Sequence, residues 1–190
     1  MKESRRRFFY VEDDSARVGG WVLSVPRDAQ GNMVDPRLFT AGRNFDSPIG
    51  LSMPIYRSGI SQGFSFAALE MPVVMREVGD LIDRVAPGQV QRIPVIVDDQ
   101  EREFEILNVT RTIKCIDEQR SNITYWTTED DRPDRVGQYR MIISMQIDPD
   151  LVGESDIFRP VGWKIRLIVS ERLRGVLEDM SVRGIIFMDV

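Results

Sequence analysis

The 190-residue sequence contains no histidine, and this absence removes several kinds of active site. Without imidazole the chain cannot build a Ser-His-Asp triad or a Cys-His pair, and it lacks a histidine base for work near neutral pH. The usual histidine ligands of catalytic zinc and of mononuclear iron are missing as well. The enzyme chemistry left open is that of carboxylates: glycoside hydrolysis by an acid pair, or hydrolysis with Mg²⁺ held by Asp and Glu.

Cysteine is almost as scarce, because Cys115 is the single thiol. One thiol allows no internal disulfide and no zinc site built from several cysteines. Cys115 lies in an alternating run, Thr112 to Ile116, which predicts a small buried residue and not a nucleophile. This usage is typical of a reducing compartment, so we expect the protein to be cytoplasmic.

Long apolar runs are also lacking, since no stretch approaches the roughly 18 residues of a membrane span. Ser4-Arg5-Arg6-Arg7-Phe8-Phe9 resembles the start of a twin-arginine export signal. Such a signal continues with an apolar segment, but here Glu12-Asp13-Asp14 follow almost at once. We therefore expect no membrane partner.

The net charge is −5, and the basic residues form no patch beyond Arg5-Arg6-Arg7. Nucleic-acid binding depends on clustered Lys and Arg, so we expect no nucleic-acid partner. Neither GxxxxGK[ST] nor GxGxxG occurs, so the sequence gives no support for a phosphate-binding loop.

Acidic residues gather in four short clusters, each between periodic segments. Asp at such positions favours turns, because its side chain binds the backbone a few residues on. We interpret the clusters as turns, and we keep a carboxylate- or Mg-dependent hydrolase or phosphoesterase as the alternative function. The clusters are Asp13-Asp14, Asp98-Asp99, Asp130-Asp131 and Asp148-Pro149-Asp150.

The length fits one domain over residues 1–190, with about 70% of the surface of the unfolded chain buried on folding. We expect a loop-rich part over about 1–70 and a regular part over about 71–190. Two principal helices are predicted, at about 72–86 and 170–181. The first carries an apolar stripe and ends at Pro87-Gly88; the second begins at Ser170, a residue suited to a helix N-cap, and ends before Gly184.

The remaining periodic segments alternate with period two, which predicts strands. The predicted fold class is therefore α+β, with a mixed, mainly antiparallel sheet. Two loops are candidate contact surfaces: 42–63, which is rich in glycine, and 127–136, which is polar. The strands are expected at 8–10, 21–25, 90–97, 104–109, 113–116, 139–147, 163–169 and 185–188.

Several short segments, in their order and spacing, resemble a family of bacterial immunity proteins of polymorphic toxin systems, the group typified by a myxobacterial immunity protein. The resemblance covers nearly the whole chain and is best from Pro72 onward. The segments are Phe39 with Gly42, Pro72-Val73-Val74, Ile93-Pro94-Val95, Leu107-Asn108-Val109-Thr110, Cys115-Ile116-Asp117-Glu118 with Ser121, Asp156-Ile157-Phe158-Arg159, Ile168 to Leu173, and Gly184 with Phe187.

The resemblance implies a cytosolic antidote that binds a cognate secreted toxin, occludes it, and protects the producing cell and its kin in competition between bacteria. It brings no catalytic residue, no cofactor and no metal, and it leaves open the toxin, the contact surface and the oligomeric state. The motif positions have no assigned role: Asp117, Ser121, Phe158, Arg159, Ser170, Glu171 and Gly184.

For most of these positions the residue type favours a structural interpretation. Ser170 and Glu171 suit a helix start, Gly184 a helix exit and Phe158 the core. Asp117 and Arg159 are expected to form a buried ion pair that fixes the fold.

Overall fold

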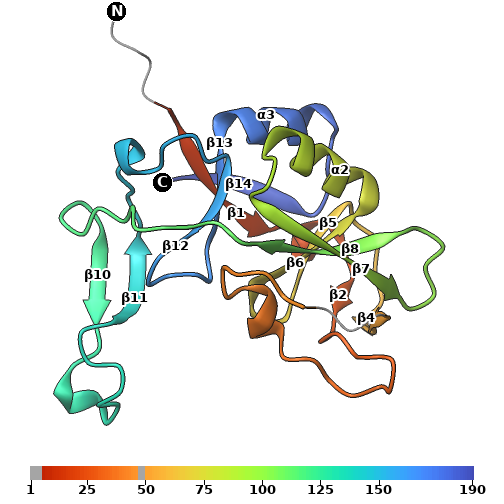
Figure 1. Ribbon diagram of the computed structural model, residues 1–190, viewed down its shortest axis with the longest axis horizontal. Coiled ribbons are helices and arrows are strands. Elements are labelled where there is room, and N and C mark those ends of the chain that lie inside the picture. Colours follow the sequence, from red (N-terminus) through yellow and green to blue (C-terminus); the bar gives the residue numbers. More distant parts are fainter. Residues whose placement is uncertain (1–5, 47–49) are drawn as a thin grey trace, which may run out of the picture.

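Two five-stranded sheets and two helices make up the body of the protein in the computed structural model, which describes residues 6–46 and 50–190 (Figure 1). One sheet is antiparallel except for the pair β3–β7. Its strands in spatial order are β3 (Leu51–Met53), β7 (Val90–Val97), β8 (Phe104–Val109), β6 (Met71–Met75) and β5 (Phe64–Ala67).

The second sheet is antiparallel except for the pair β12–β9. Its strands in spatial order are β14 (Ile185–Asp189), β1 (Phe8–Asp13), β13 (Leu167–Ser170), β12 (Ile157–Pro160) and β9 (Thr112–Ile113). The α+β class and the mainly antiparallel pairing predicted from the sequence are confirmed.

The other elements connect or flank these sheets. Helices α2 and α3 lie side by side over the sheets (Figure 1). The helices are α1 (Ser15–Val18), α2 (Arg76–Val85) and α3 (Glu171–Asp179), with short 3₁₀ turns η1 (Pro36–Phe39), η2 (Ala68–Glu70), η3 (Thr128–Asp130) and η4 (Pro149–Leu151). Two small ribbons complete the fold: β2 (Val22–Leu23) with β4 (Ile55–Arg57), and β10 (Asn122–Tyr125) with β11 (Tyr139–Ser144).

Helix α2 begins later than the sequence predicted, because its expected first turn is the strand β6. Met71–Met75 is buried along its whole length and pairs with β5 on one side and β8 on the other. The periodicity of a short, fully apolar run such as this one cannot distinguish a strand from a buried helical turn. The amphipathic part of the stripe is helical, with Val78 and Ile82 buried.

Helix α3 begins where the sequence predicted. The Ser170 side chain accepts a hydrogen bond from the backbone N–H of Leu173 at 3.2 Å, as an N-cap does. The helix then runs to Asp179, and Leu173 and Leu177 pack into the core.

The strand predicted at 139–147 forms only over Tyr139–Ser144, as β11, and burial along it does not follow a simple alternation. Ile142 is buried, whereas Met141 and Ile143 are exposed. The cause is a pair of bulges in the pairing of β11 with β10. Asn122 and Ile123 pair with Ser144 and Ile142, so Ile143 is an extra residue on β11. Thr124 and Tyr125 pair with Met141 and Tyr139, so Arg140 is a second extra residue. Each bulge inserts an extra residue and reverses the alternation.

The strand predicted at 163–169 is shorter in the structure, because Trp163 to Arg166 form turns and β13 begins at Leu167. Gly162 introduces these turns with a φ of +84°, a conformation that glycine adopts without strain.

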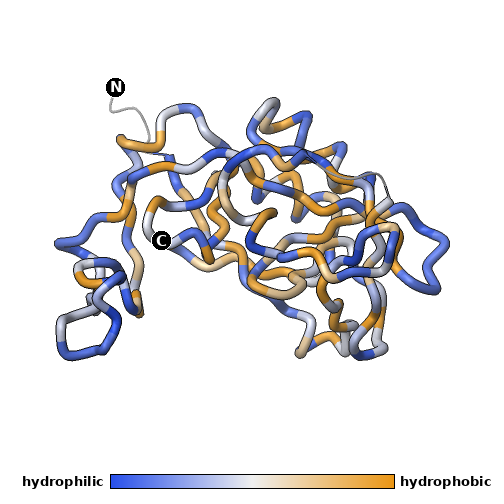
Figure 2. The backbone as a smooth tube through the Cα atoms, turned by 60° about the horizontal axis from the view of Figure 1, so that its bottom comes forward, coloured by the Kyte–Doolittle hydropathy of each residue, from blue (hydrophilic) through white to orange (hydrophobic). Residues whose placement is uncertain are grey.

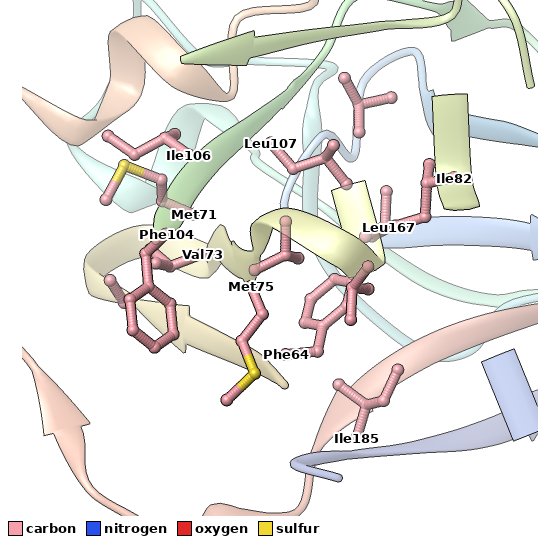
Figure 3. Close-up of a cluster of buried hydrophobic side chains, with 14 of the residues drawn as sticks. Phe64, Met71, Val73, Met75, Ile82, Phe104, Ile106, Leu107, Leu167 and Ile185 are labelled. Atoms are coloured by element: carbon pink, nitrogen blue, oxygen red, sulfur yellow. The ribbon is translucent and has the colours of Figure 1, made fainter. Parts of the chain in front are cut away.

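The second sheet is buried on both faces, and each face adjoins a different apolar cluster. Phe9, Val11 and Val169 join the large cluster that fills the space between the two sheets. Figure 3 shows part of this cluster, with Phe64, Met71 and Leu167 among its side chains. The alternate residues, Phe8, Phe158 and Ile168, join a second cluster on the opposite face.

The loop-rich N-terminal part contributes strands to both sheets. β1 lies between β13 and β14, and β3 and β5 are the outer strands of the first sheet. Residues 1–5 and 47–49 lie outside the described residues, so parts of the Arg5–Arg7 run and of the loop 42–63 cannot be placed.

Candidate functional site

The ribbon β10–β11 projects from the body as an arm (Figure 1). We use "arm" for residues 122–144, which include the predicted loop 127–136 at the tip. Figure 2 shows the tip mainly in hydrophilic colours, whereas most hydrophobic segments lie in the body. The inner side of the arm packs on the second apolar cluster through Ile142, with Ile123 and Tyr139 partly buried against it.

Two motif residues, Asp117 and Ser121, fix the base of the arm. The Ser121 hydroxyl accepts a hydrogen bond from the N–H of Gln146 at 2.9 Å and donates to its carbonyl at 3.2 Å. The N–H of Asp117 donates to the same carbonyl at 2.8 Å, and its carboxylate accepts from the N–H groups of Gln119 and Arg120. These bonds close the turn that leads into β10 and join it to the chain after β11.

Glu118 ties both strands of the arm to this base. Its carboxylate accepts hydrogen bonds from the hydroxyls of Tyr125 at 3.0 Å and Tyr139 at 2.6 Å. The bond from Tyr139, followed by that from Tyr125, lowers the pKa of Glu118. Burial, reinforced by the Glu118 carboxylate, raises the pKa of both tyrosines, so the phenols remain protonated at neutral pH.

Aromatic and guanidinium groups surround a hollow of about 530 Å³ between the arm and the body. Trp126 contacts Arg135 and Arg140, whose guanidinium carbons are 5.6 and 5.0 Å from the ring centre. Trp163 lines the hollow from the body side, together with Tyr139 and the exposed Ile165. Trp, Tyr and Arg are the residue types most enriched at the energetic centres of protein interfaces.

The arm is pressed against the body at Gly162. A Cβ built on Gly162 would lie 2.7 Å from the Tyr139 ring, so the absence of a side chain allows the two to pack closely. The arm is therefore joined to the body through its base, through Glu118 and through this contact.

The outer face of the arm carries exposed apolar side chains. Ile143 is 68% exposed and Met141 is 51% exposed. Ile143 is one of the two inserted bulge residues of β11. Bulges commonly redirect a side chain, and here the effect is to place an isoleucine in solvent.

A second candidate surface lies at the turn between β7 and β8. Ile96 is 70% exposed and lines a groove of about 510 Å³ together with Pro94 and Leu51. The turn carries exposed carboxylates at Asp98, Asp99 and Glu101. The predicted loop 42–63 meets this groove through β3, and it also exposes Tyr56.

Arg159 does not pair with Asp117, and the expected ion pair was wrong. Arg159 is fully buried and donates to two backbone carbonyls, those of Lys164 at 2.6 Å and Glu70 at 2.9 Å. Burial lowers the pKa of Arg159 to about 10. Asp117 is paired with Arg120, three residues away, because an adjacent guanidinium reaches it without crossing the core.

A buried ionic network around Asp156 was not singled out from the sequence. Asp156 accepts a hydrogen bond from the Ser170 hydroxyl at 2.5 Å and contacts the guanidinium groups of Arg6 and Arg172. Burial would raise the pKa of Asp156, but the bonds from Arg172 and Ser170 outweigh it, and the pKa is lowered. The signal was available, since Asp156 and Ser170 both belong to the motif segments.

The other motif residues have structural surroundings. Phe158 packs edge-on against Phe8, with ring centres 5.8 Å apart. Glu171 is exposed in the first turn of α3 and pairs with Arg7 at 3.4 Å. Gly184 has a φ of +106°, and a Cβ there would lie 2.0 Å from the carbonyl oxygen of Phe64.

Three of the four acidic clusters accept hydrogen bonds within their own turns, as predicted, and Asp98-Asp99 lies in the turn between β7 and β8. The Asp13 carboxylate accepts from the N–H and hydroxyl of Ser15, Asp130 accepts from the N–H of Thr127, and Asp148 accepts from the N–H of Asp150. Within the described part of the chain, no three Cys, Asp or Glu side chains are grouped so that they could hold a metal ion. Among the same residues, no helix has the length and apolar character needed to cross a bilayer.

Comparison with known families gives one match. The sequence profile of the immunity protein family Imm11 matches residues 68–190, which is more than half of the chain. No curated protein matches the sequence. The matched region contains the whole arm, the β7–β8 turn and all seven motif positions.

Proposed function

The chain belongs to the Imm11 immunity protein family, and we propose that it binds a cognate protein toxin and keeps it inactive by occluding it. The toxin would belong to a polymorphic toxin system used in competition between bacteria. The complex would form in the cytoplasm, where the toxin would otherwise reach its target. The family match is the observation that carries this proposal.

The surroundings of the motif residues are consistent with a binding protein. Phe158, Arg159, Ser170 and Gly184 are buried or packed against the backbone, so they act on the fold and not on a ligand. A standard interface takes about 800 Å² from each partner. That area is less than a tenth of the 10982 Å² that the protein exposes.

The alternative, a carboxylate- or Mg-dependent hydrolase, has less support. It rested on the acidic clusters, and the carboxylates of Asp13, Asp130 and Asp148 accept hydrogen bonds within their own turns. It predicts a rise in melting temperature with Mg²⁺, because a cation that binds only the folded state stabilises it. We expect 10 mM MgCl₂ to raise the melting temperature no more than a NaCl control of equal ionic strength.

Co-expression with the toxin tests the proposal directly. The first step is to identify the gene directly upstream; a large modular protein encoded there would supply its C-terminal domain as the partner to test. The active domain should kill a host cell, and co-expression of this chain should restore growth. A form of the domain inactivated by substitution should copurify with the tagged chain. Failure of both protection and copurification would falsify the proposed function.

A further inference from the structure

The outer face of the arm combines exposed apolar side chains with a backbone that is hydrogen-bonded at its base. Its side chains are apolar, with Ile143 and Met141 more than half exposed, and its backbone is firmly held. The base is closed by the bonds between Ser121 and Gln146, and both strands are tied to Glu118. Rigid surfaces bind more tightly because less conformational entropy is lost on association.

The bulges of β11 favour binding through side chains over pairing through the strand edge. A partner strand requires a regular row of N–H and C=O groups, and bulges interrupt that row at Arg140 and Ile143. The same bulges turn the Ile143 side chain outward. Ile143 is therefore placed to enter a pocket, with Met141 beside it on the same strand.

The charges at the tip indicate what a partner that extends along the arm should carry there. Glu129 and Asp131 are exposed, and neither forms an ion pair with another residue in 6–46 or 50–190. The neighbouring acids are already paired, Asp130 with Arg140 and Asp134 with Arg132. These two unpaired carboxylates lie at the tip, at the other end of the ribbon from Ile143, and they complement a basic surface on a partner that extends along the arm.

We propose that the outer face of the arm docks on the toxin, with Ile143 inserted in an apolar pocket and the acidic tip facing a basic surface of the toxin. This inference rests on the proposed function and adds the surface and its chemistry. Asp117, Ser121 and Glu118 act as positioning residues, since they hold the arm without facing the toxin.

A matched pair of variants tests the surface. Ile143→Asp and Ile96→Asp replace isoleucines of nearly equal exposure, 68% and 70%, on strands at different parts of the protein. The probe is the inactivated toxin domain described above, with binding measured by titration calorimetry. We expect I143D to weaken binding by about 100-fold or more, as at an interface centre, and I96D by less than about threefold.

Controls separate binding from folding. Both variants should keep the wild-type melting temperature within about 2 °C, because neither side chain is buried. If I143D unfolds, Ile143→Ser replaces it, with Ile96→Ser as its match. Glu129→Gln with Asp131→Asn should slow association several-fold at low salt and leave dissociation unchanged.

The outcomes distinguish this inference from the proposed function. If I143D binds the toxin as tightly as the wild type, the arm is not the docking surface, although toxin binding itself stands. If I96D loses binding instead, the interface lies at the β7–β8 groove. A wild-type chain that does not bind the toxin overturns both. Light scattering measures the oligomeric state of the wild type and of I143D. If the wild type is a dimer and I143D is a monomer, the inference is overturned, because the arm would then bind a second copy of this chain.

Discussion

Ser170 and Asp156 are joined by a hydrogen bond of 2.5 Å that links the start of helix α3 to the chain entering β12. The Ser170 hydroxyl donates to the carboxylate and also accepts from the N–H of Leu173, so one side chain caps the helix and holds a buried charge. Arg172, in the first turn of the same helix, and Arg6, just before β1, also reach this carboxylate. The start of α3 and the N-terminal part of the chain therefore converge on Asp156.

Removing that carboxylate should destabilise the protein strongly. Asp156→Ala leaves Ser170 without its acceptor and two guanidiniums without their partner, so we expect a loss of about 3 kcal/mol in the free energy of unfolding. Urea denaturation measures it. Glu171→Gln, which removes an exposed ion pair one residue after Ser170, should cost less than about 0.5 kcal/mol. Equal effects of the two variants would contradict the network.

The contribution of Asp156 should depend on pH. Its pKa is lowered in the folded protein, so the unfolded chain binds the proton more readily. The stabilisation is therefore present above the unfolded pKa of about 3.9 and is lost as the pH falls through the lower folded value. The difference in unfolding free energy between wild type and Asp156→Asn should be constant from pH 5 to 7 and shrink below about pH 4. A difference that grows on acidification would refute this assignment.

Two glycine substitutions should change the free energy of unfolding in opposite directions. Gly184→Ala places a Cβ 2.0 Å from the Phe64 carbonyl oxygen and forces a φ of +106° on alanine. We expect a loss of about 3 kcal/mol or more. Gly175→Ala lies within α3 with nothing within 4 Å of its Cβ, so it should gain up to about 1 kcal/mol. Thermal unfolding of both variants provides the comparison.

Cys115 should be unreactive until the protein unfolds. The residue is fully buried, and burial raises the pKa of its thiol to about 12, so almost no thiolate is present at neutral pH. Labelling with a disulfide reagent should be slow in buffer and rapid in denaturing urea. Rapid labelling of the native protein would show that the second apolar cluster is open to solvent.

The expectation of one domain over residues 1–190 stays a prediction that truncation can test. A chain starting at residue 68 keeps the family-matched region but lacks β1, which separates β13 from β14. It also lacks β3 and β5, so two faces of the core are exposed to solvent. We expect this fragment to show no cooperative thermal transition by circular dichroism, whereas the full chain shows one. Cooperative unfolding of the fragment would show that 68–190 is an independent domain.

Sequence patterns predicted helices and strands best where only one face of the element is buried, or where a capping residue marks its end. Ser170 marks the start of α3, and the alternation of 90–97 gives β7, with Ile93, Val95 and Val97 buried. The patterns failed for Met71–Met75, which is apolar on every side, and for β11, where two bulges reverse the alternation. Bulges depend on the pairing partner, and a single strand's sequence does not contain that information.

The candidate site was predicted only in outline. The polar run 127–136 indicated an exposed loop, and it forms the tip of the arm. The anchoring of the arm by Ser121 and Gln146, and the partners of Arg159, depend on contacts between residues far apart in the chain. Residue types alone suggested an ion pair between Asp117 and Arg159. Whether two such residues meet depends on the topology of the fold, which the sequence patterns did not give.

The pairing of β1 with β14 has a consequence for biosynthesis. The first and last strands of the described chain lie side by side, so a nascent chain on the ribosome cannot complete this sheet until β14 has emerged. Contacts between such distant segments slow folding. We expect a delay between the end of translation and the appearance of the folded protein, during which only previously made molecules are active.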